Sequence, residues 1–243
     1  MNKVAIVTGG SRGIGAATSK LLASQGYAVC INYLARSEDA EKLAAEITAD
    51  GGKVMTYAAD VSEEADVIGL FDAAEKMLGP VTHLVNNAGI LFTQSSLVDL
   101  SVERFNKVML TNVTSCFLCS REAVKRMTQG GAIVNVSSVA SRTGSPNEYV
   151  DYAASKGAMD TLTTGLSLEV ADKNIRVNCV RPGFIHTEMH ADGGEPGRVE
   201  RLSPLIPMKR GGEPEEVANA IAWLLSDEAS YVTGSFIDLA GGK

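Results

Sequence analysis

The chain has 243 residues, of which 45% are hydrophobic, so it is long enough to bury a large core in one α/β domain. Its formal net charge of −7 would repel nucleic acids and anionic membranes, which excludes both as partners and leaves a small molecule as the expected one. The stretch before Gly10 holds too few apolar residues for a signal-peptide core or a membrane span. We therefore expect a cytoplasmic protein.

Short β-branched runs alternate with amphipathic stretches along almost the whole chain. Strands are predicted at 3–7, 28–32, 53–57, 82–86, 132–136, 175–180 and 235–239. Several of the intervening stretches end on glycine, as helices commonly do, and longer helices are predicted near 102–127, 152–171 and 214–225. This alternation predicts an α/β fold: a doubly wound parallel sheet of the Rossmann type, with about seven strands and helices on both faces.

No repeat, low-complexity tract or linker interrupts this alternation, so residues 1–243 are expected to form a single dinucleotide-binding and catalytic domain. One segment departs from it. Residues 184–211 are rich in Gly, Pro and charge and are longer than most connections in a compact domain. Such insertions often act as lids, and we expect a substrate-binding loop there.

The helix predicted over 214–225 places Val217, Ile221 and Leu225 on one face. That face fits either the core or an interface between subunits.

Two sequence patterns could indicate a metal site or thiol chemistry. Cys116 and Cys119 form a CxxC within a predicted helix, without a second cysteine pair or a nearby histidine, so buried thiols are expected. His186 and His190 flank Glu188 in HTEMH, but the order is not HExxH and no third ligand is evident. We expect no metal site.

A glycine turn follows the first predicted strand and opens the first helix. Gly9, Gly13 and Gly15 are spaced GxxxGxG in TGGSRGIG. Glycines let the backbone approach a pyrophosphate, and a helix N-terminus supplies free amide donors and partial positive charge. The turn therefore predicts a dinucleotide site.

Tyr152 and Lys156 lie one helical turn apart in YAASK. A phenol with an ordinary pKa of about 10 is a poor acid or base near neutrality. An ammonium about 4 Å away, at an effective dielectric of about 20, could lower that pKa by up to about three pH units. We therefore predict that Lys156 activates Tyr152. Tyr149 has Ala153 in place of a lysine four residues later, so it is not expected to take this role.

The chain resembles the short-chain dehydrogenase/reductase family in an ordered set of motifs from Val4 to its closing TGSFIDLAGG. They are TGGSRGIG at 8–15, Asp60 and Val61, NNAG at 86–89, Asn112, the serine pair 137–138, YAASK at 152–156 and RPGFIHT at 181–187.

The resemblance implies a catalytic group. Tyr152 would protonate a carbonyl oxygen as hydride arrives, and Ser138, matched in preference to Ser137, would bind the same oxygen. Lys156 would bind the nicotinamide ribose, and Asn112 would hold a water of a proton relay.

The same resemblance implies the cofactor contacts. They are Gly9, Ser11, Arg12, Gly13, Ile14, Gly15, Tyr33, Arg36, Asp60, Val61, Asn86, Ala88, Gly89, Tyr152, Lys156, Pro182, Gly183, Ile185 and Thr187. Structural alternatives are that Asp60 caps the helix predicted to begin near Ser62 and that Asn86 satisfies backbone groups at the strand end.

The form of the nicotinamide cofactor depends on the end of the second strand. The family resemblance implies that the acid which binds the ribose hydroxyls in NAD sites would stand at Tyr33. No Asp or Glu occurs from Ala28 to Ser37. Arg12 and Arg36 are the cations available for a 2′-phosphate. We therefore expect NADP to be preferred over NAD.

The expected activity is the interconversion of a ketone and a secondary alcohol. Reduction of 3-oxoacyl groups on a carrier protein and oxidation of glucose are alternatives, and a non-enzymatic NADP-sensing regulator is a third. An acidic carrier protein would need a basic patch, for which Lys125, Arg126 and Arg142 are candidates. The family resemblance also implies a homotetramer formed through the two long helices near 102–127 and 152–171 and through the C-terminal strand.

Overall fold

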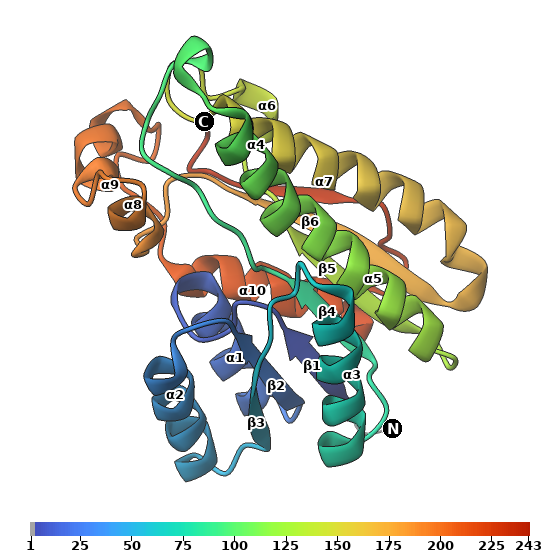
Figure 1. The fold of residues 1–243 in the computed structure, drawn as a ribbon. Coiled ribbons are helices and arrows are strands. Elements are labelled where there is room, and N and C mark those ends of the chain that lie inside the picture. The colour runs from blue at the N-terminus through green and yellow to red at the C-terminus, as the bar shows by residue number, and fades with distance from the viewer. Residues whose placement is uncertain (1–2) are drawn as a thin grey trace.

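One parallel sheet organises the chain, and the computed structural model describes residues 3–243. Its strand order is β3-β2-β1-β4-β5-β6-β7 (Figure 1). The strands are β1 (Val4–Val7), β2 (Ala28–Tyr33), β3 (Val54–Ala58), β4 (His83–Asn86), β5 (Gly131–Val136), β6 (Ile175–Pro182) and β7 (Phe236–Leu239). The predicted fold class and all seven predicted strands are thereby confirmed.

Ten α-helices are assigned within residues 3–243. They are α1 (Gly13–Ser24), α2 (Ser37–Ala49), α3 (Glu64–Leu78), α4 (Val102–Met109), α5 (Ser115–Arg126), α6 (Ala140–Thr143), α7 (Val150–Glu169), α8 (Met189–Asp192), α9 (Arg198–Leu202) and α10 (Pro214–Leu225). In this described part of the chain, no helix combines the length and the apolar character needed to span a bilayer.

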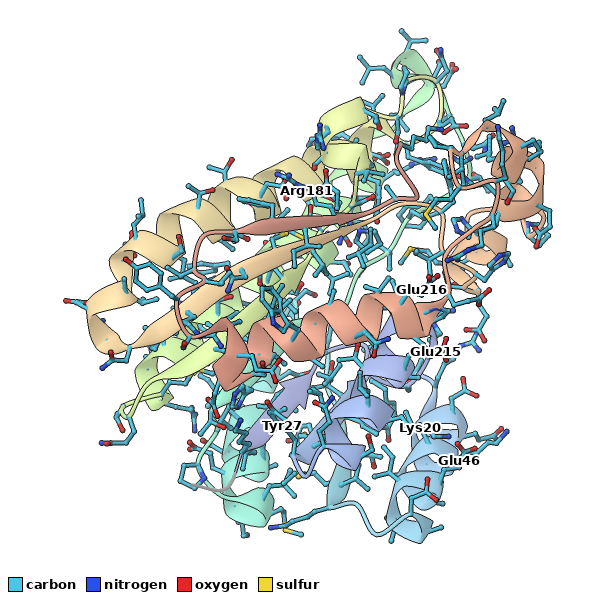
Figure 2. All side chains as sticks on the ribbon, turned by 180° about the vertical axis from the view of Figure 1, so that it is seen from behind. Lys20, Tyr27, Glu46, Arg181, Glu215 and Glu216 are labelled. Atoms are coloured by element: carbon cyan, nitrogen blue, oxygen red, sulfur yellow. The ribbon has the colours of Figure 1, made fainter. Side chains whose placement is uncertain are left out.

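The strands bury both of their faces, because successive side chains point to opposite sides of the sheet. Ile6 belongs to one core, which is completed by residues of α3 and α5, whereas its neighbour Val7 belongs to the other, completed by residues of α1, α2 and α10. Figure 2 shows the second side, where α10 crosses in front of the sheet near α1. There Lys20 of α1 pairs with Glu46 of α2 at 3.3 Å.

The predicted helix 214–225 coincides with α10. Val217, Ile221 and Leu225 are each at most 1% exposed and belong to the core shared with α1 and the sheet. The structure thus assigns this apolar face to the core of the chain itself.

The predicted helix 102–127 is a continuous helical run with a wider turn inside it. The segment Leu110–Thr114, between α4 and α5, is a π-helix. A π turn accommodates an extra residue and is frequent at functional sites. Asn112 lies within it and is fully buried.

The topology brings distant loops together at one edge of the sheet. The chain winds outward from β1 to β3 and then returns to β4 beside β1, so the loops after β1 and β4 diverge from neighbouring strand ends. Such a switch point opens a crevice at the carboxyl edge of a doubly wound sheet. The segment 184–211, which carries α8 and α9, lies at this end of the molecule (Figure 1).

Candidate active site

The glycine turn is shaped for close approach of a ligand to the backbone. Gly9 and Gly13 have positive φ of 57° and 51°, a conformation that favours glycine. A Cβ added to Gly15 would lie 2.2 Å from the Gly9 carbonyl oxygen, so no side chain fits there. Because α1 begins at Gly13, its free amide groups open at the same place. The residues fit the pyrophosphate of a dinucleotide.

Two asparagines that sequence reasoning did not select hold this turn. Asn87 donates from its side-chain amide to the carbonyls of Thr8 and Gly9, at 3.0 and 2.9 Å. Thr8 Oγ1 in return accepts from the backbone amides of Asn87 and Ala88, both at 3.0 Å. On the other side, Asn32 of β2 accepts from the Gly9 amide at 3.3 Å. The only available signal for Asn87 was its place in NNAG.

Asn86, the first asparagine of NNAG, has a structural role in the sheet. Its side chain is buried between β4 and β5, where it donates to Asn135 Oδ1 at 2.8 Å and Ser120 Oγ at 2.9 Å. It therefore holds the sheet and a helix together. Gly89, further along, does border the catalytic group, since a Cβ there would lie 3.3 Å from Asn112 Oδ1 and 3.5 Å from Lys156 Nζ.

The residues expected near the adenosine follow the ends of β2 and β3. Tyr33 ends β2, and the nearest acids, Glu38 and Asp39, lie in the first turn of α2 as expected. Asp60 and Val61 follow β3. The Asp60 carboxylate accepts from the amide and the hydroxyl of Ser62, at 2.9 and 2.6 Å. Since α3 begins at Glu64, the alternative of Asp60 as the cap of a helix beginning near Ser62 is wrong.

Both expected phosphate-binding cations already have acidic neighbours. Arg12 Nη2 lies 2.6 Å from Asp192, and its Nη1 lies 3.7 Å from Glu188, both in or beside α8. Arg36 is exposed and pairs with Asp39 at 3.2 Å. The Arg12 pair connects the glycine turn, which also carries Ser11, directly to the 184–211 segment.

The buried Asn112 braces the backbone beside the site. Its Oδ1 accepts from the Ile90 amide at 2.8 Å, and its Nδ2 donates to the Ile90 carbonyl and to Ser155 Oγ, both at 3.0 Å. Ser155 belongs to α7. Asn112 thus joins the loop after β4 to the helix that carries Tyr152 and Lys156.

Lys156 is a buried ammonium at the end of β5. Its side chain projects from α7, its residue is 3% exposed, and Nζ donates to the Val136 carbonyl at 2.8 Å. Ser137 Oγ donates to the Lys156 carbonyl at 3.1 Å and so fixes the helix to the strand end. Ser138 lies with Tyr152 and Lys156 in the wall of one cavity. Ser137 therefore anchors the helix to the strand, whereas Ser138 lines the cavity.

The electrostatics of Tyr152 differ from the expectation. Burial raises the pKa of Tyr152 to about 12, and the hydrogen bond with Ser138 opposes this rise. The prediction that Lys156 lowers this pKa is wrong, because Nζ is directed to the Val136 carbonyl and lies 5.5 Å from the centre of the phenol ring. The phenol is therefore protonated at neutral pH. Burial also lowers the pKa of Lys156 to about 8.

A cavity of about 260 Å³ opens beside these groups. Expected cofactor residues form one part of its wall: Ile14, Pro182, Gly183, Ile185 and Thr187. Residues of the 184–211 segment, among them Met189, His190 and Arg198, form another part. The arrangement places Ile14 of the glycine turn, a protonated phenol and a buried ammonium around one open cavity.

Cys116 and Cys119 lie outside the wall of this cavity, whereas His190 is part of it. Burial raises the pKa of Cys116 to about 12 and raises that of Cys119 further, so both thiols stay protonated. His190 lies 3.0 Å, through Nε2, from the Ile185 carbonyl. Across residues 3–243, no group of three or more His, Cys, Asp or Glu side chains is arranged to hold a metal ion.

Fold and site together define a nicotinamide-dependent oxidoreductase class, and comparison with known proteins gives the family. The profile described as "Enoyl-(Acyl carrier protein) reductase" matches residues 9–243. A mutant short-chain dehydrogenase/reductase from Serratia marcescens superposes with a TM-score of 0.92 at 38% identity, covering 99% of this chain and 97% of that one. The chain belongs to the short-chain dehydrogenase/reductase family, whose members use NAD(P) and act on CH–OH groups.

Individual relatives span nearly the whole chain. The oxidoreductase YgfF of Escherichia coli K12 is 65% identical over 99% of both chains. Glucose 1-dehydrogenase 2 of Bacillus subtilis is 38% identical over 99% of this chain and 94% of its own. An NADPH-dependent aldehyde reductase-like protein from Arabidopsis thaliana chloroplasts is 40% identical, over 99% and 93%.

The glycine turn yields a test with a matched control. Gly15→Ala places a Cβ against backbone, so we expect NAD(P)H to bind at least about tenfold more weakly, the equivalent of about 1.4 kcal/mol. Gly165→Ala in α7 meets nothing within 4 Å and should leave binding unchanged. Fluorescence titration with NADPH and NADH measures both. Equal binding by wild type and Gly15→Ala would contradict the assignment.

The pKa of Lys156 can be measured directly. With ¹³C-labelled lysine, we expect one side-chain resonance to titrate near pH 8, and we expect Lys156→Met to remove it. The folded-state pKa lies below the unfolded value, so the unfolded chain binds more protons between about pH 8 and 10.5. Stability contributed through this group therefore rises with pH across that window. A spectrum with no lysine titrating below about pH 9.5 would contradict the burial argument.

Proposed function

We propose that the protein is an NADP-dependent oxidoreductase that interconverts a ketone and a secondary alcohol, with Tyr152 as the general acid and base. The observation that carries this proposal is the shared cavity: Ser138, Tyr152 and Lys156 line the same space as residues at the mouth of the glycine turn. A nicotinamide cofactor bound at that turn would supply or accept the hydride.

The chain's own residues suit proton transfer to a carbonyl oxygen. Burial keeps the Tyr152 proton in place at neutral pH, which suits a general acid. The Ser138 hydroxyl is positioned to share a hydrogen bond with the same oxygen. Lys156, held at the end of β5 by the Val136 carbonyl, is suited to bind the ribose of the nicotinamide. Asn112 acts by bracing the loop at Ile90 against α7. Thr187 and Ile185, at the cavity wall, are suited to contact the nicotinamide.

Removing the Tyr152 hydroxyl tests this assignment. We expect Tyr152→Phe to lower kcat at least about 100-fold, the lower end of what a positioned acid contributes, while NADPH binding stays within about threefold. Steady-state kinetics and cofactor titration on the same preparations measure both. A Tyr152→Phe enzyme with near-normal turnover would rule the mechanism out. Wild-type binding of NADPH without turnover of any carbonyl compound would favour the regulator instead.

The preference for NADP rests on the end of β2. Tyr33 stands where an acid would bind the ribose hydroxyls, and Arg36 is exposed before α2. The NADPH-dependent name of the Arabidopsis relative agrees with this preference. The acids beside Arg12 and Arg36 reduce the attraction of either cation for a phosphate, so preference without exclusivity is expected.

Arg36 provides the corresponding measurement. Arg36 is exposed, so solvent screens its attraction for a 2′-phosphate, and Arg36→Ala should lower kcat/KM for NADPH by about tenfold or less. The kcat/KM for NADH should change by less than about threefold, since NADH lacks the 2′-phosphate. Lys42→Ala, an exposed substitution on α2, is the control. Equal losses with both cofactors, or a wild type that prefers NADH, would overturn the preference.

The alternative of a reductase acting on carrier-protein thioesters receives less support. The family profile carries an acyl-carrier-protein name, but the candidate docking cations are paired with acids. Lys125 pairs with Glu122, Arg142 with Asp238, and Arg126 with three carboxylates. Pairing removes most of the positive potential that an acidic partner would need. The names of relatives that act on glucose, a steroid and cyclohexanol favour a small alcohol or ketone.

A homotetramer in the cytoplasm remains part of the proposal. Phe105, Leu110 and Phe117 are exposed along α4, the π turn and α5, and Leu168 is exposed on α7. Exposed apolar side chains on these two helical runs are consistent with their use as subunit contacts. The mass of the protein in solution tests the assembly.

A further inference from the structure

The Tyr149 hydroxyl is a buried polar group that the proposed mechanism leaves unused. Tyr149 is 4% exposed and lines the same cavity as Tyr152. Within the described part of the chain, its hydroxyl has no hydrogen-bond partner. An unpaired buried hydroxyl is costly, and such groups in native structures commonly have a functional reason.

The backbone before Tyr149 is held in an unusual conformation. Ser145 and Asn147 have positive φ of 43° and 60°, which is uncommon for residues other than glycine. The Ser145 carbonyl accepts from the Tyr149 amide at 3.1 Å, so this loop sets where Tyr149 enters α7. Strain of this kind clusters at binding sites, where it fixes a side chain.

A buried arginine fixes the Tyr149 ring from the other side. Arg198 of α9 is 5% exposed and lies 4.9 Å from the centre of that ring. It donates to Glu148 at 3.2 Å and to Glu195 at 3.1 Å, which ties the 184–211 segment to the strained loop. Two carboxylates neutralise this guanidinium, so it is not available to attract an anionic substrate.

The cavity that Tyr149 lines is mostly apolar. Its wall includes Leu91, Val139, Phe184 and Met189, together with the polar residues Ser145, Glu148 and His190. A Cβ on Gly193 would lie 3.3 Å from the Tyr149 hydroxyl and 2.3 Å from Leu91, so the segment after α8 closes directly over it. A ligand here would have an apolar body, and only a group that hydrogen-bonds would satisfy the phenol.

We propose that Tyr149 is a specificity-determining residue whose hydroxyl binds a second oxygen of a neutral carbonyl substrate. Tyr149 and Tyr152 are three residues apart at the start of α7, so their side chains leave neighbouring positions of one turn. One phenol serves the reacting carbonyl and the other recognises a hydroxyl or carbonyl elsewhere on the molecule. The substrate class is therefore hydroxyketones and their diol products. This inference rests on the proposed oxidoreductase function.

A matched substrate series tests the inference. Wild type and Tyr149→Phe are compared with cyclohexanone and with 2-, 3- and 4-hydroxycyclohexanone, using NADPH. We expect wild type to prefer at least one hydroxyketone over cyclohexanone. Tyr149→Phe should lower kcat/KM for that hydroxyketone by about fivefold, the usual value of one neutral hydrogen bond, and leave cyclohexanone within about twofold. Comparing each substrate with itself across the two enzymes cancels its intrinsic reactivity.

Thermal unfolding of the two enzymes without substrate separates recognition from a structural role. Because the hydroxyl makes no bond within the protein, Tyr149→Phe should unfold at the same temperature as wild type or higher. A lower unfolding temperature, or equal losses on all four ketones, would overturn the inference. Absence of any preference for a hydroxyketone in an active wild type would overturn it while leaving the oxidoreductase function intact. If the wild-type enzyme oxidises no NADPH with any of these ketones, both the Tyr149 inference and the oxidoreductase function are rejected for this substrate class.

Discussion

The rest of the site is arranged around one buried charge, the ammonium of Lys156. Lys156 carries its ammonium to the carboxyl edge of β5, where transfer from water is unfavourable unless a polar partner compensates. The Val136 carbonyl at the strand end is that partner, and Ser137 holds the backbone of α7 against the same edge. The register between this helix and this strand then determines where Tyr152 and Ser138 lie. A shift of α7 by a single residue would separate the ammonium from its acceptor.

Much of the fold was predictable because its signals are local. Each strand is a run rich in β-branched residues, and its two faces contribute to the two cores on either side of the sheet. The turns between the elements carry glycine or polar residues where the chain bends. Gly9, Gly13 and Gly15 were identifiable for the same reason, since a missing side chain at a fixed spacing is a local property. Helix α10 was predicted at both of its ends, because Pro214 and the capping acids mark its start.

The less predictable features depend on contacts between segments distant in the sequence. Asn87 and Asn32 look like ordinary strand-end polar residues until the topology places both beside the glycine turn. The pKa of Tyr152 was predicted in the wrong direction because helical spacing to Lys156 was treated as a contact. Burial acts on both groups more strongly than they act on each other. Tyr149 likewise carries no sequence signal, because what distinguishes it is a loop conformation and an arginine about fifty residues away.

The π turn between α4 and α5 controls the rotational phase of two helices. A residue advances an α-helix by about 100°, so the additional residue in the wide turn rotates everything after it about the helix axis. Asn112 faces the site from the wide turn, while the exposed Phe105 before it and Phe117 after it keep their outward directions. A one-residue deletion within 110–114 would preserve the length of the helical rod and its composition almost unchanged. It would nevertheless rotate the outer surface of α5 by about 100° relative to α4, so insertions and deletions here are constrained by angle rather than by space.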